Sequence, residues 1–163
     1  MRKAEAIISV LQGRGRQKAN LKRVYRLLYN KELYLKAYSN IYANSGAMTP
    51  GATNETADGM SVDLIEQIIK ELRQERFKWT PVKRIYIPKR NGKTRPLGIP
   101  TWRDKIVQEV MRMLLEAYYE GRFWKYSHGF RPGKGCHTAL LEIQKTWKGT
   151  IWFIEGDIEK CFD

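Results

Sequence analysis

The feature that most constrains the fold is a pair of short apolar runs on either side of a tight turn. Residues 82–87 (VKRIYI) and 94–99 (TRPLGI) have the composition of β-strands, and Asn91-Gly92 between them is a favoured turn pair of tight hairpins. Proline has no amide hydrogen to donate to a sheet, so the prolines at positions 88, 96 and 100 keep these strands short or at an edge. The sequence therefore predicts a β-hairpin here.

The tip of this hairpin is strongly basic. It carries Lys89, Arg90, Lys93 and Arg95. Such charges can protect an edge strand from pairing with other chains, or they can hold phosphate groups. The pattern favours the second interpretation, a projecting clamp for phosphates.

The rest of the chain is mainly helical in pattern. Apolar residues recur at helical spacing in residues 20–43, 61–77, 101–123 and 136–147, and Ser61 and Thr101 are suitable N-cap residues. Residues 43–60 are rich in Gly, Ser, Thr and Asn and predict a long loop. The expected fold class is α+β, with mostly helical structure around the basic hairpin.

The net charge points to an anionic partner. The chain has 30 Lys and Arg against 17 Asp and Glu, a formal charge of +13, and nucleic acid is the first candidate, with an anionic membrane surface a distant second. Residues 1–40 hold ten basic and two acidic side chains. Within them Lys22, Arg23 and Arg26 either form a solvated helix face or contact phosphates, and the scarcity of acids favours phosphates.

Cysteine and histidine give no sign of a metal centre. Cys136 and Cys161 do not have the spacing of metal-binding cysteines, which argues against a zinc site. Two cysteines also do not make a disulfide framework, which favours a reducing, intracellular setting. His128 precedes a Gly-rich basic loop and His137 follows it, and both are interpreted as hydrogen-bonded residues. The sequence shows no secretion signal and no apolar run of membrane-spanning length.

The last residues combine an apolar run with an acid. Ile151 to Ile154 predict a buried strand, and Asp157 follows it. Mg²⁺ prefers carboxylate oxygens and is often shared with substrate phosphates, so Asp157 is a candidate ligand. A helix-starting acid is the alternative interpretation of Asp157. One carboxylate does not complete a two-metal site, and further carboxylates must come from another element.

Three blocks carry a family resemblance. In chain order they are PVKRIYIPKRNGKTRPLGIPTWRDKIVQE, SHGFRPGKGCHTAL and WFIEGDIEKCFD. They resemble the first blocks of the reverse transcriptase domain of group II intron-encoded proteins. The stretch SGAMTPGATNETADGMS and the basic N-terminal helix resemble the extension that precedes the fingers in that family.

This resemblance implies an architecture and a set of functional residues. The architecture is a helical fingers subdomain with a basic hairpin and the first strand of a right-hand polymerase palm. Its parts would be a basic extension and template-side loop (1–60), the fingers (61–149) and the first palm strand (150–163). The implied roles are metal binding by Asp157 and the Ile158 carbonyl, nucleotide binding by Lys89, Arg95 and the steric-gate residue Phe162, and template or RNA binding by Arg131, Lys22, Arg23, Arg26 and Lys93.

The same resemblance implies cofactors and partners. They are two Mg²⁺ ions in the complete enzyme, group II intron RNA, an RNA template, a DNA primer and deoxynucleoside triphosphates. The function would be RNA-directed DNA polymerisation together with splicing (maturase) activity, in the bacterial cytoplasm or an organelle. Glu159 and Asp163 are expected to be surface charges, and homodimerisation is left open.

The Tyr-x-Asp-Asp block of that family, which supplies the other catalytic carboxylates, is not found in these residues. We therefore expect a fragment that cannot polymerise by itself but binds structured RNA in a salt-dependent manner. Two alternatives remain. The chain is a stand-alone RNA-binding fingers module, or it comes from the reverse transcriptase of a retron or a diversity-generating element.

Overall fold

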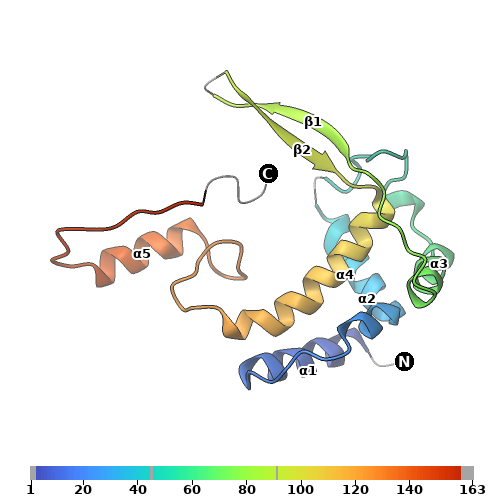
Figure 1. Cartoon of the computed structure of the whole chain (residues 1–163), viewed down its shortest axis with the longest axis horizontal. Helices are drawn as coiled ribbons and strands as arrows, with labels where there is room; N and C mark the ends of the chain where they lie inside the picture. Colours follow the sequence, from blue (N-terminus) through green and yellow to red (C-terminus); the bar gives the residue numbers. More distant parts are fainter. Residues whose placement is uncertain (1–2, 45, 91, 159–163) are drawn as a thin grey trace. The chain divides into compact units, whose positions relative to one another are not determined.

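The computed structural model describes residues 3–44, 46–90 and 92–158. The chain divides into two compact units, residues 1–122 and 123–163, which are considered separately. Figure 1 shows mainly helices and, in the described part of the chain, one two-stranded antiparallel hairpin, so the expected α+β class is confirmed.

The first unit is organised around the long helix α4 (Trp102–Tyr119). Helices α1 (Ala4–Arg16) and α2 (Lys31–Tyr42) and the 3-10 helix η1 (Val24–Tyr29) pack against it, while α3 (Val62–Arg73) packs against η1 and α2. One face of each helix supplies the apolar core. Its most completely buried large side chains are Trp102, Tyr34, Leu33, Ile65, Ile68, Ile106 and Leu114.

Helices α1 and α4 approach each other closely at a glycine. A Cβ atom added to Gly15 would lie 2.0 Å from the carbonyl oxygen of Tyr118, a distance that no side chain tolerates. The hydroxyl of Tyr118 in turn donates a hydrogen bond to the carbonyl of Ala19 at 2.6 Å. The contact holds the C-terminal end of α1 and the chain after it against α4.

The N-terminal region differs from the sequence prediction. Helix α1 was not predicted, and the single helix expected over residues 20–43 is broken into η1 and α2. The break lies at Asn30, whose side-chain oxygen accepts a hydrogen bond from the Glu32 amide at 2.9 Å and caps α2. Since an N-cap residue has extended backbone angles, one continuous helix cannot pass through Asn30.

Several local predictions are confirmed. Strands β1 (Lys83–Pro88) and β2 (Thr94–Ile99) form the hairpin. The side chain of Ser61 caps α3 by accepting a hydrogen bond from the Leu64 amide, and the side chain of Thr101 caps α4 in the same way through Asp104. Residues 43–60 contain only turns and the short 3-10 helix η2 (Ala57–Gly59) among those described. The 3-10 helix η3 (Glu120–Arg122) ends the first unit.

The second unit contains α5 (Cys136–Thr146) and extended chain. The buried strand expected over Ile151 to Ile154 does not form among the described residues, and these side chains are 71% to 102% exposed. A strand needs a neighbour for its backbone groups, and in the described part of the chain β1 and β2 pair only with each other. Leu140 of α5 is also 63% exposed.

In the described part of the chain, no helix has both the length and the apolar character needed to cross a membrane.

Candidate nucleic-acid interface

The hairpin presents its cations on an exposed tip. In its register Ile87 lies opposite Arg95, and Pro88 lies opposite Thr94. The turn is closed by hydrogen bonds from the Lys89 amide to the Lys93 carbonyl (2.6 Å) and from the Gly92 amide to the Lys89 carbonyl (3.1 Å). Gly92 has a φ of +76°, a conformation that glycine adopts at little cost.

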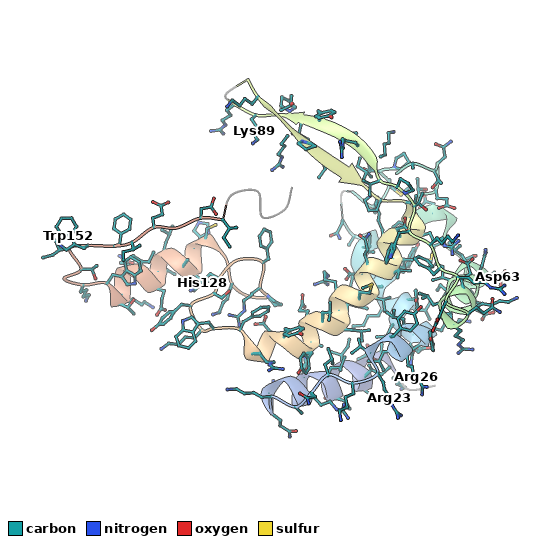
Figure 2. The ribbon with its side chains drawn as sticks, in the orientation of Figure 1. Arg23, Arg26, Asp63, Lys89, His128 and Trp152 are labelled. Carbon is teal, nitrogen blue, oxygen red and sulfur yellow. The ribbon has the colours of Figure 1, made fainter. Side chains whose placement is uncertain are left out.

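Strand alternation sorts the hairpin side chains into two faces. Arg95 shares a face with Ile85, Ile87 and Leu97, while Tyr86 and Pro96 lie on the other. Lys89, Arg90 and Arg95 are exposed, and none of the ion pairs among the described residues involves them. Figure 2 shows Lys89 at the far end of the hairpin. The predicted clamp thus has available positive charge, and its phosphate-binding role stays a prediction.

The base of the hairpin is fixed to the start of α4. Asp104 is 1% exposed, and its Oδ2 atom accepts hydrogen bonds from the Thr80 amide (3.0 Å) and the Thr101 hydroxyl (2.9 Å). A Cβ atom on Gly51 would lie 2.4 Å from the carbonyl oxygen of Pro100, so the loop backbone is also held close to this junction. The hairpin is therefore an exposed arm whose base is tied to α4 by these contacts.

The loop of residues 43–60 is held against the helices. The Lys105 ammonium donates to the carbonyl of Thr49 at 2.7 Å, and burial lowers the pKa of Lys105. The indole of Trp102 donates to the sulfur of Met60 at 3.3 Å. Ala47 and Ala57 are buried. The family resemblance implies that this loop lies along the template strand, and that position stays a prediction.

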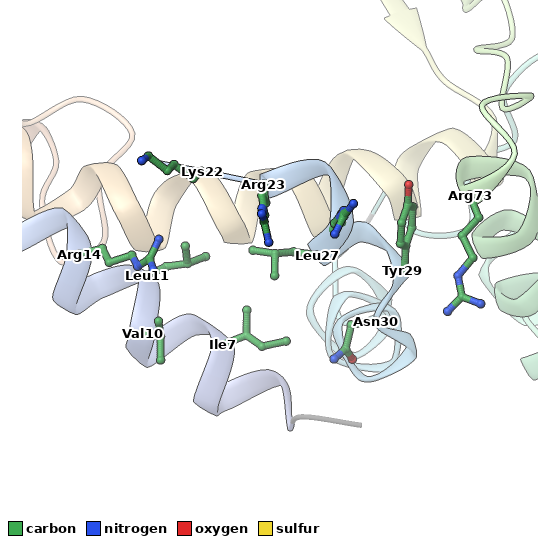
Figure 3. Close-up of a pocket in the computed structure, with 11 residues that line it drawn as sticks. Ile7, Val10, Leu11, Arg14, Lys22, Arg23, Leu27, Tyr29, Asn30 and Arg73 are labelled. Carbon is green, nitrogen blue, oxygen red and sulfur yellow. The ribbon is translucent and has the colours of Figure 1, made fainter. Parts of the chain in front are cut away.

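A second basic surface lies between α1, η1 and α3. A hollow of about 470 Å³ there has an apolar floor and a basic rim, shown in Figure 3. The floor includes Ile7, Val10, Leu11 and Leu27, and no acid lines the hollow among the described residues. The cations at its rim are Arg14, Lys22, Arg23, Arg26 and Arg73. We call this feature the basic hollow.

The basic hollow gathers residues that the sequence predicted and others that it missed. Lys22, Arg23 and Arg26 were expected to contact RNA, and the structure brings them together. Arg14 comes from α1 and Arg73 from α3, and neither was predicted. A signal for Arg14 existed, since Ala4, Ile7 and Leu11 have helical spacing that would have placed it on a helix.

Arg131, a predicted template-side residue, organises its own loop in the second unit. Its guanidinium donates to the carbonyls of Trp124 (3.0 Å) and Ser127 (2.8 Å) and lies over the ring of Phe123, 5.3 Å from the ring centroid. The side chain is half-buried. These contacts show a structural role, and its template role stays a prediction.

The same loop is tied to the start of α5. Thr138 Oγ1 accepts a hydrogen bond from the Gly135 amide at 2.9 Å and lies 2.8 Å from Nδ1 of His128. The interpretation of His128 as a hydrogen-bonded residue is therefore confirmed. His137 is exposed.

The predicted metal ligand lies in extended chain. Asp157 and Ile158 are exposed, and Ile158 is the last described residue. Among the described residues, no group of three or more His, Cys, Asp or Glu side chains forms a metal site. Asp157 thus contributes one carboxylate, and the described donors do not complete the set that a two-metal site requires. Phe162, Glu159 and Asp163 lie outside the described residues.

The sequence matches a known protein family. The profile of the reverse transcriptase (RNA-dependent DNA polymerase) family matches residues 87–163, which include the tip of the hairpin, the Arg131 loop and Asp157.

Individual relatives extend this match toward the N-terminus. The group II intron-encoded protein LtrA of Lactococcus lactis subsp. cremoris is 49% identical over 142 residues, covering 86% of this chain and 24% of that protein. An uncharacterised 91 kDa protein in the cob intron of Schizosaccharomyces pombe is 51% identical over 136 residues, covering 83% of this chain and 17% of that protein. Nuclear intron maturase 1, mitochondrial, of Arabidopsis thaliana is 42% identical over 64 residues, 39% of this chain and 9% of that protein.

The chain spans about a quarter or less of the length of these relatives. The identities of 49% and 51% extend over 86% and 83% of this chain. Residues 87–163 thus match the reverse transcriptase family, and over most of its length the chain is similar to group II intron-encoded proteins.

Proposed function

We propose that this chain is the fingers part of a group II intron reverse transcriptase that also serves as a maturase. In the complete protein the reaction would be RNA-directed DNA synthesis from deoxynucleoside triphosphates on a DNA primer. The observation that carries the proposal is the exposed hairpin with Lys89 and Arg95, whose base is hydrogen-bonded to α4. The chain that carries it is 49% identical to an intron-encoded protein over 86% of the chain's own length.

The proposed roles follow the charges of the ligands. Lys89 and Arg95 would bind the triphosphate, because a guanidinium and an ammonium on an exposed arm can neutralise several phosphate oxygens. Lys93 and Arg131 would lie on the template side. Lys22, Arg23 and Arg26 would contact intron RNA. Residues 1–60, 61–149 and 150–163 would correspond to the extension, the fingers and the first palm strand.

Asp157 and the carbonyl of Ile158 would each contribute one ligand to Mg²⁺. When bound, two such ions would stabilise the attacking and leaving oxygens of phosphoryl transfer. Because the described residues offer no complete donor set, the other ligands must come from elsewhere in the whole protein. Phe162 would lie below the sugar of the incoming nucleotide and disfavour a 2′-hydroxyl. The site of action would be the bacterial cytoplasm or an organelle.

A chimera tests the polymerase assignment. Residues of this chain would replace the aligned 142 residues of LtrA, and primer extension on an RNA template would be measured. We expect the chimera to extend the primer and Asp157→Asn to abolish extension, with Glu155→Gln as the matched control. Arg95→Gln should raise the KM for the triphosphate. An Asp157→Asn chimera with an unchanged rate would refute the assignment.

The isolated chain tests the remaining claims. It should show no primer extension, since most of the metal ligands are lacking, and it should bind structured RNA with an affinity that falls steeply with salt. If the affinity were the same at low and moderate salt, the basic surfaces would not be the part of the chain that binds the RNA. If the chimera is inactive while the isolated chain binds RNA, the alternative of an RNA-binding module is favoured.

A further inference from the structure

The basic hollow combines a basic rim with an apolar floor, and binding of a double-stranded nucleic acid would not require both. Its rim of five cations suits phosphates, whereas its floor is apolar. Val10 lies on this floor and is 52% exposed, so apolar surface remains accessible beneath the cations. A double helix presents phosphates and sugars to such a surface and keeps its base faces stacked inside. An unpaired nucleotide instead offers a base face as well as phosphates.

An aromatic and guanidinium pair lines the same hollow. The guanidinium of Arg73 lies 5.6 Å from the centroid of the Tyr29 ring, and Tyr29 is supported edge-on by Tyr25 at a centroid distance of 5.7 Å. Unpaired bases stack on tyrosine rings and on guanidinium planes. The volume of about 470 Å³ lies within the range of small-ligand sites, about 300–1,000 Å³.

The charges at the rim are available for a ligand. None of the ion pairs among the described residues involves Arg14, Lys22, Arg23, Arg26 or Arg73. A second hollow of about 370 Å³ shares Tyr29 and Arg73 and adds Lys31 and Lys70, together with Glu66, which pairs with Lys31. The positive surface therefore continues from α1 across to α3.

The backbone at Arg23 has a conformation that bears on the design of a test variant. Its φ of +57° and ψ of 31° lie in the left-handed region, which glycine adopts easily and other residues rarely do. Arginine is therefore unfavourable for the backbone at this position. In Figure 3 its side chain extends over the hollow beside Leu27.

We propose that the basic hollow binds one unpaired nucleotide of an RNA, with the base against Val10, Leu27 and the Tyr29 ring and the flanking phosphates on Arg14, Arg23, Arg26 and Arg73. The proposal rests on the proposed function only in taking RNA as the ligand. It adds that this surface recognises a base and does not bind the backbone alone.

The test compares three RNAs with the whole chain: an octamer of uridine, the same ribose-phosphate octamer without bases, and a blunt duplex of similar length. We expect the affinity for the uridine octamer to be at least about fivefold higher than that for the abasic octamer, because stacking of a single base strengthens binding by at least that factor. It should also bind more tightly than the duplex.

Four variants locate the binding. Val10→Gln and Tyr29→Leu should bring the ratio between the two octamers close to one, because they alter the floor without changing charge. Arg26→Gln should weaken both octamers alike and reduce the slope of log affinity against log salt by about one. Arg76→Gln removes an exposed arginine outside both hollows and should leave the ratio and affinity nearly unchanged.

Arg23→Gly separates folding from binding. It should keep or raise the melting temperature, because glycine fits the backbone, while it weakens both octamers. Since its stability is not reduced, weak binding by this variant cannot be explained by unfolding.

Several results would overturn the inference. The first two are an affinity for the uridine octamer equal to that for the abasic octamer, and one equal to that for the duplex. The third is a ratio between the two octamers that is unchanged in Val10→Gln and Tyr29→Leu. The fourth is displacement of the uridine octamer by octaglutamate at equal concentration. In these cases binding of structured RNA would persist and the proposed function would stand. Loss of all RNA binding by the unmodified chain would instead refute the RNA-binding part of the proposed function.

Discussion

The buried carboxylate of Asp104 accepts a hydrogen bond from the backbone amide of Thr80 at 3.0 Å. This bond joins the segment before β1 to the first turn of α4. We expect Asp104→Ala to lower the free energy of unfolding by about 2–3 kcal/mol, because the Thr80 amide and the Thr101 hydroxyl both lose their acceptor.

Chemical denaturation measures this loss, and hydrogen exchange at the Thr80 amide shows whether the hairpin base opens. Asp63→Ala is the matched control, since Asp63 is an exposed acid in the first turn of α3 and its removal should cost only a few tenths of a kcal/mol. Equal effects of the two substitutions would contradict the anchoring role of Asp104.

Two glycines in one helix should respond in opposite ways to alanine. Gly15→Ala should destabilise the protein strongly or prevent folding, because its Cβ atom would overlap the Tyr118 carbonyl. At Gly13 an added Cβ meets nothing within 4 Å, so Gly13→Ala should raise stability by about 0.5–1 kcal/mol through helix propensity. Thermal unfolding of both variants checks this, and a Gly15→Ala protein as stable as the parent would disprove the close helix contact.

The ion pair of Glu109 should make stability sensitive to acid. Burial opposes the charge of Glu109, but hydrogen bonds from Arg112 (2.7 Å) and Asn40 (3.0 Å) hold its pKa below the ordinary value. A carboxyl group with a lowered folded-state pKa stabilises the fold above its unfolded-state pKa, and this contribution is lost as pH falls through the folded-state pKa.

Denaturant unfolding at a series of pH values measures that loss. Glu109→Gln should be less stable than the parent at neutral pH and should lack this part of the acid-dependent loss. Asn40→Ala should show an intermediate response, because the Arg112 bonds remain. If Glu109→Gln retained the full pH dependence, another group would be responsible.

Arg131 should hold its loop through geometry more than through charge. Arg131→Lys keeps the charge, but a single ammonium cannot reproduce the paired guanidinium bonds to Trp124 and Ser127 together with the contact to Phe123. We expect faster proteolysis and faster amide exchange in residues 123–135. Arg90→Lys, at the hairpin tip, should leave that region unchanged. Unaltered exchange in Arg131→Lys would show that the loop is stable without these bonds.

The parts of the fold that were predictable depend on local chemistry. Asn91-Gly92 specifies a tight turn whatever surrounds it, and Ser61 and Thr101 cap the helices that follow them. Each of these features is decided within a few residues of chain. The helix break at Asn30 was missed although its cap is equally local, because the apolar spacing of residues 20–43 suggested continuity.

The candidate site was less predictable because it depends on tertiary contacts. Lys22 and Arg26 are close in sequence and could be grouped without a structure. Arg73 reaches the same hollow only because α3 packs against η1. Asp157 shows the opposite case. Its role was inferred from a family motif, and among the described residues no group of three or more such ligands forms around it.

The exposed run from Ile151 to Ile154 has a practical consequence for work with this chain in solution. Four large apolar side chains in succession, without strand partners among the described residues, form a segment of the kind that stacks between molecules. Concentrated preparations should therefore aggregate through this segment, and salt should promote it by screening the repulsion between chains of charge +13. Low ionic strength, which also strengthens RNA binding, is thus the condition in which the chain should remain monodisperse.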